Sequence, residues 1–129
     1  MSNAESLIAP LAEEWPPFGL TEEPLLGGLV LTVSGELDLA SAPELRKRLV
    51  AAVDSGTTRI VVDLREVTFM DSIGLAAVLH ARSRLRPAGR LALIVTPGSY
   101  AQLVLESTGT SRALAIFADR DPAIAHVGG

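Results

Sequence analysis

The 129-residue chain contains no cysteine, which excludes disulfides, thiolate metal ligands and cysteine nucleophiles. The absence fits a reducing compartment, so we expect a cytoplasmic protein. Only five residues are aromatic, so the core must be built from aliphatic side chains. No apolar run approaches the roughly 18 residues that span a bilayer, and the N-terminus lacks the basic and apolar regions of a secretory signal. Together these absences indicate a small globular protein with an aliphatic core.

Acidic residues are concentrated at the start of the chain, although the net charge is only −4. Residues 1–28 contain five acidic side chains, no basic side chain and four prolines. We predict an acidic, proline-rich arm over residues 1–28 and a folded domain over residues 29–129. Trp15 and Phe18 would allow the arm to dock on the domain, and a short strand could form near Phe18. The nearly neutral remainder lacks the basic patch that nucleic-acid binding requires.

From Leu29 onward, β-branched runs alternate with segments of helical periodicity. The predicted strands cover residues 29–34, 59–64, 91–95 and 114–117. The predicted helices start at a capping box formed by Ser41 and Glu44, at Ser72, near Gly98 and at a cap formed by Asp121. This alternation predicts a single α/β domain with a mixed, mostly parallel sheet and helices packed on it.

The inventory of reactive groups argues against an enzyme. Of the two histidines, neither His80 nor His126 has a partner at a metal-binding spacing. Ser72 and His80 lie on one helix about 12 Å apart, too far for a nucleophile and its base. Phosphate-binding and nucleophile-elbow glycine motifs are missing. We therefore predict no catalytic site, no metal and no cofactor.

Two segments stand out. Gly35–Asp38 lies where a strand leaves the sheet, and continued extension would turn Leu37 and Leu39 toward the core. Residues 69–75 run from an apolar pair into Asp71 and Ser72, either of which could cap the following helix.

Gly74 then lies in the first helical turn, where glycine costs up to about 1 kcal/mol relative to alanine. Its presence suggests close approach of another backbone or of a partner. On a helical wheel, the predicted core side holds Leu75, Val78, Leu79 and Leu85. The opposite side holds Ile73, Ala77, His80 and Arg84. Ile73 is thus either an exposed apolar residue beside Ser72 or part of a helix start that is buried on both sides.

These motifs, in this order, resemble the STAS domains of bacterial anti-sigma factor antagonists over residues 29–127. The resemblance implies a protein that binds an anti-sigma factor serine kinase, releases a sigma factor, and is switched off when the kinase phosphorylates Ser72. It also implies a phosphatase that resets Ser72. The resemblance places Asp38 and Asp71 near the partner-binding surface, beside Ser72. From their positions on the helix we add to this predicted surface Ile73, Gly74, Ala77 and His80.

The chain departs from the family at Ile73, where a second serine is frequent, and at Ala76, where a glycine is frequent. One alternative keeps the fold without the switch, as a docking subunit of a sensory or transport complex in which Ser72 is only a cap. Another is a small enzyme or nucleotide-binding domain. Thr68 is a second candidate phosphorylation site.

Overall fold

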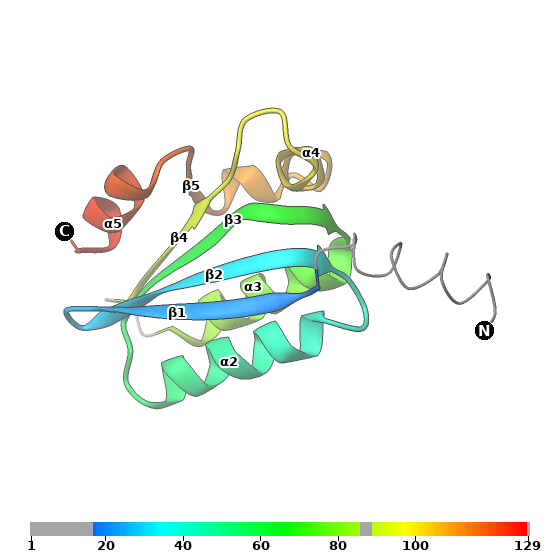
Figure 1. The fold of residues 1–129 in the computed structure, drawn as a ribbon. Coiled ribbons are helices and arrows are strands. Elements are labelled where there is room, and N and C mark those ends of the chain that lie inside the picture. The colour runs from blue at the N-terminus through cyan, green and yellow to red at the C-terminus, as the bar shows by residue number, and fades with distance from the viewer. Residues whose placement is uncertain (1–16, 86–88, 129) are drawn as a thin grey trace, which may run out of the picture.

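A computed structural model of the chain describes residues 17–85 and 89–128 (Figure 1). Its strands are β1 (Gly19–Leu25), β2 (Gly28–Leu37), β3 (Arg59–Met70), β4 (Arg90–Ile94) and β5 (Ala115–Phe117). Its α-helices are α2 (Ala42–Asp54), α3 (Ser72–Arg84), α4 (Tyr100–Ser107) and α5 (Arg120–Gly128). A 3-10 helix, η1 (Thr110–Arg112), precedes β5. No helix of the described ranges is long and apolar enough to cross a membrane.

The five strands form one sheet in the order β1-β2-β3-β4-β5. β1 pairs antiparallel with β2, and every other neighbouring pair is parallel. The predicted α/β architecture with a mostly parallel sheet is therefore confirmed.

The predicted boundary after residue 28 is wrong, because it separates β1 from β2, the strand with which β1 is paired. β1 lies within the segment assigned to the arm, yet it pairs with β2 along its whole length. Pro24 is tolerated in β1 because this strand lies at the sheet edge, where a missing N–H costs no ladder bond. Phe18 and Leu20 pack against the main core. The rest of the predicted arm, residues 1–16 with Trp15, lies outside the described residues.

The core is aliphatic, as predicted, and has two parts. In Figure 1, α2 and α3 lie on one side of the sheet and α4 and α5 on the other. Leu45 and Leu49 of α2 are fully buried in the larger cluster, which confirms the predicted apolar stripe of that helix. The smaller cluster joins inner-strand side chains to Ala123 and Val127 of α5.

Two elements differ in extent from their prediction. β3 continues six residues past the predicted end at Leu64, because a register shift against β2 keeps the pairing while Arg65 and Glu66 stay exposed. α5 begins at Arg120, so Asp121 lies in its first turn and is not its cap.

One charged side chain is buried in the sheet. Asp63 accepts hydrogen bonds from the Arg65 guanidinium, with its Oδ1 3.0 Å from Nε and its Oδ2 2.9 Å from an Nη atom. The side-chain hydrogen bond to Asp63 raises the pKa of Arg65 above its ordinary value. The ion pair with Arg65 compensates the negative charge of Asp63, which would be costly to bury without a partner.

Candidate functional site

The two segments singled out in the sequence meet where strands β2 and β3 end, side by side in the sheet. Leu37 at the end of β2 is paired with Met70 at the end of β3. The backbone N–H of Asp71 donates to the Leu37 carbonyl oxygen over 3.2 Å. The residues that follow β2 and those that begin α3 therefore form one continuous surface.

Asp71 caps helix α3. Its Oδ1 accepts hydrogen bonds from the backbone N–H of Ile73 at 2.9 Å and of Gly74 at 3.1 Å. Ser72 is the first helical residue, is exposed, and takes no part in this cap. Of the two candidate caps, the structure thus selects Asp71, and the interpretation of Ser72 as a cap is wrong.

The loop between β2 and α2 is held by a different arrangement. Asp38 Oδ1 accepts from the backbone N–H of Ala40 at 3.0 Å and of Ser41 at 3.2 Å. Ser41 Oγ donates to the Glu36 carbonyl oxygen at 2.7 Å and accepts from the Asp38 N–H at 2.9 Å. The predicted capping box is therefore wrong, because the Ser41 hydroxyl bonds back into the loop and makes no cap bond to α2.

This loop also corrects the prediction for Leu39. The chain leaves the extended conformation at Asp38, so Leu37 is buried as predicted but Leu39 is turned outward and is 69% exposed.

The close approach predicted at Gly74 is confirmed, and the neighbour belongs to the same chain. A Cβ on Gly74 would lie 2.6 Å from Leu37 Cγ and 2.9 Å from the Leu37 carbonyl oxygen. Glycine is therefore needed for α3 to start against the end of β2. Gly74 is itself buried, so it shapes the surface without contributing a side chain to it.

The two sides of α3 differ from the helical-wheel prediction. Ala77, predicted to face away from the core, is only 4% exposed because α2 packs against that side of α3. Ile73 is 42% exposed, so the interpretation as an apolar surface residue beside Ser72 holds. His80 is half-buried between the two helices and lines the hollow described next.

A groove runs between α2 and α3, starting next to Ser72. Its first hollow, of about 170 Å³, is lined by Leu39, Ala42, Pro43, Arg46, Ile73, Ala76, Ala77 and His80. A second hollow continues along the helices and is lined by Pro43, Arg46, Lys47, Val50, His80 and Arg84. We call these two hollows together the α2–α3 groove. It was missed in the sequence because the pattern of one helix does not indicate which other helix lies beside it.

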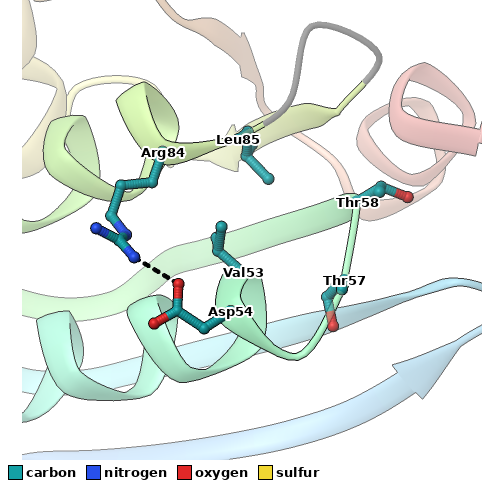
Figure 2. Close-up of a pocket in the computed structure, with 7 residues that line it drawn as sticks. Val53, Asp54, Thr57, Thr58, Arg84 and Leu85 are labelled. Atoms are coloured by element: carbon teal, nitrogen blue, oxygen red, sulfur yellow. Dashed lines mark hydrogen bonds and ion pairs between the residues drawn. The ribbon is translucent and has the colours of Figure 1, made fainter.

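A separate pocket of about 350 Å³ lies at the other end of the two helices. Figure 2 shows Val53, Thr57, Thr58 and Leu85 around it, with an ion pair of 2.5 Å between Arg84 and Asp54. The pocket is remote from Ser72, since Ser72 begins α3 and Arg84 ends it.

The chemistry available at the Ser72 surface is limited. Within the part of the chain that the structure describes, no group of three or more histidine, cysteine or acidic residues could hold a metal ion. What the surface offers is an exposed hydroxyl at a helix N-terminus, beside the exposed apolar side chains Leu39 and Ile73. Helix N-termini favour negative charge, and Ser72 lies at such a position.

Comparisons with known proteins identify relatives of the chain. Two relatives are BtrV of Bordetella bronchiseptica, 36% identical over 52% of this chain and 58% of that protein, and the anti-sigma-F factor antagonist RsfB of Mycobacterium tuberculosis, 26% identical over 80% of this chain and 84% of that protein.

Two solved structures share the fold. An anti-sigma factor antagonist from Mycobacterium paratuberculosis matches with a TM-score of 0.80 and 24% identity, over 88% of this chain and 96% of that one. The Bacillus cell fate determinant SpoIIAA in its phosphorylated form matches with a TM-score of 0.65 and 26% identity, over 84% of this chain and 99% of that one. The family model of the STAS domain matches residues 21–123, a range that includes most of β1. The chain therefore belongs to the STAS domain family.

Proposed function

We propose that this protein is an anti-sigma factor antagonist that is controlled by phosphorylation of Ser72. In the unphosphorylated state it binds an anti-sigma factor that is also a serine kinase, and so releases a sigma factor. Phosphorylation of Ser72 by that kinase ends the binding, and a phosphatase restores it. The protein acts in the cytoplasm by binding and has no catalytic role of its own.

The observation that carries this proposal is the exposed side chain of Ser72. Because Asp71 supplies the cap, the Ser72 side chain is exposed at the first position of α3. Thr68, the other candidate acceptor, is also exposed, but it lies within strand β3, at an irregularity in the register with β2. A kinase requires an acceptor that can enter its active site, and we expect the start of a helix to present one more readily than a residue within a sheet.

The physical basis of release is charge. Phosphorylation adds about −1.5 to −2 charges, directly beside the Asp71 carboxylate. If an acidic side chain of the partner lies about 4 Å from this negative group, the repulsion across a partly hydrated interface costs about 4 kcal/mol. That cost corresponds to roughly a thousandfold loss of affinity. The fold need not change for the complex to dissociate.

The proposed binding surface consists of Ser72, Ile73, Leu39 and the α2–α3 groove with His80. Exposed apolar side chains grouped in this way commonly mark protein interaction sites. Asp38 and Asp71 contribute mainly by fixing the loops, since each uses Oδ1 to hold two backbone amides. Ala77 lines the first hollow of the groove, and Gly74 allows α3 to start in close contact with Leu37.

The direct test combines phosphorylation with release. The protein would be incubated with ATP and a kinase-type anti-sigma factor captured by pull-down, and peptide mapping would locate the phosphate. We expect one phosphate on Ser72, loss of the kinase from the complex, and neither result for Ser72→Ala. Ser83→Ala, which changes another serine of α3, is the matched control and should behave as wild type.

A stable complex without phosphate on Ser72 would contradict the switch. It would favour a constitutive docking subunit of a sensory or transport complex, for which the exposed Leu39 and Ile73 would be sufficient.

A further inference from the structure

The α2–α3 groove has a chemical character that identifies what it can bind. Its start is apolar, with Leu39 69% exposed and Ile73 42% exposed. Every charged side chain among its described lining residues is basic, namely Arg46, Lys47 and Arg84, of which Arg84 is ion-paired with Asp54. Such a groove fits a segment that carries both apolar and acidic side chains.

The chain itself enters the fold beside this groove. Because β1 is antiparallel to β2, the start of β1 lies next to the end of β2. The Pro17 carbonyl oxygen would lie 2.8 Å from a Cβ built on Gly35, two residues before Leu37. In Figure 1 the first described residues lie at the same end of the molecule as the loop from β2 into α2. The segment before Pro17 is therefore tethered at the end of the fold that bears Leu39 and Ser72.

The composition of that segment complements the groove. Residues 5–16 contain three glutamates and no basic residue. Their apolar side chains include Leu7, Ile8, Leu11 and Trp15.

The tether is also long enough. Twelve extended residues reach about 40 Å, whereas the 13 residues of α2 span about 20 Å. A short tether raises the effective concentration of a segment at a nearby site to about the millimolar range.

We infer that residues 5–16 dock in the α2–α3 groove of the same molecule, with apolar side chains over Leu39 and Ile73 and with Glu13 and Glu14 facing Arg46 and Lys47. A second copy placed groove to groove would instead bring two basic surfaces together, which is unfavourable. The inference goes beyond the proposed function.

Trp15 provides the test because it is the single tryptophan of the chain. In the full-length protein, its emission is expected at shorter wavelength than in the urea-unfolded chain, with reduced quenching by neutral acrylamide. Ile73→Lys in the groove should shift the emission to longer wavelength and raise quenching toward the unfolded value. Leu103→Lys is the matched control, since Leu103 is a 59% exposed leucine on α4, and should leave both quantities unchanged.

A second variant guards against misfolding of the groove mutant. Reversal of the arm charges by Glu13→Lys with Glu14→Lys leaves the described domain unaltered and should produce the same red shift. Circular dichroism would verify that each variant is folded.

Three outcomes would overturn the inference. The first is wild-type emission equal to that of the unfolded chain. The second is protected emission that Ile73→Lys does not change. The third is protection that is lost on dilution, which would place the segment on a second copy. Phosphorylation of Ser72 is measured separately, so failure of this inference and failure of the proposed function remain distinguishable.

Discussion

Two serines lie at the starts of the neighbouring helices α2 and α3, which follow strands β2 and β3, and their hydroxyls have opposite roles. Ser41, before α2, donates to the Glu36 carbonyl and accepts from the Asp38 N–H. Ser72, at the start of α3, is exposed and left out of the cap. The Ser41 hydroxyl therefore serves the loop, whereas the Ser72 side chain is exposed.

In both loops an aspartate carboxylate accepts hydrogen bonds from two backbone amides. Asp38 precedes Ser41 by three residues, so the turn that it closes encloses the serine hydroxyl. Asp71 directly precedes Ser72 and holds the amides of the two residues after it. The spacing between aspartate and serine thus separates a structural hydroxyl from a free one.

The largest expected effect comes from the junction that the two loops share. Gly74→Val would place its Cβ against Leu37 Cγ and the Leu37 carbonyl oxygen. We expect a loss of about 1–3 kcal/mol in the free energy of unfolding, measured by urea denaturation. The control is Ala76→Val, at an exposed position of the same helix, which should cost much less. Equal costs would show that the junction is not tightly packed.

Ser41→Ala tests the structural member of the pair. It removes two hydrogen bonds in a partly buried loop and leaves the Glu36 carbonyl and the Asp38 N–H without that partner. We expect the free energy of unfolding to fall by about 1–2 kcal/mol. A change indistinguishable from zero would mean that water replaces the hydroxyl without cost.

Ser72→Ala tests the free member and should have the smallest effect on stability. Because the hydroxyl makes no cap bond, the free energy of unfolding should change by less than about 0.5 kcal/mol. The same denaturation series measures it beside Ser41→Ala. A loss as large as that of Ser41→Ala would show that Ser72 is a structural residue and would remove the contrast between the two.

Much of the fold could be predicted because its signals are local. The β-branched run from Arg59 and the apolar stripe of Leu45 and Leu49 follow directly from the periods of strands and helices. A short strand near Phe18 was predicted, but it was placed outside the domain because its glutamates and Pro24 resemble the arm, and only its pairing with β2 makes it part of the sheet.

The candidate site was predicted in part for the same reason. Asp71, Ser72 and Gly74 are noticeable in the sequence because a cap, an acceptor and a costly glycine fall within four residues. Leu39 and Ala77 were assigned to the wrong sides, since the turn at Asp38 and the packing of α2 on α3 decide their exposure.

The sequence by itself determined the aliphatic core, the alternation of strands and helices, and the cluster of cap, serine and glycine at residue 72, because each depends on neighbours along the chain. The tertiary structure decided that the end of β2 meets the start of α3, that Asp71 and not Ser72 forms the cap, and that α2 and α3 enclose a basic, partly apolar groove. The meeting of β2 with α3 and the groove between α2 and α3 arise between segments that lie far apart in the chain, and their geometry is set by sheet register and helix packing. The choice between Asp71 and Ser72 is local, but it depends on the backbone conformation at the start of α3, which the residue types alone do not specify.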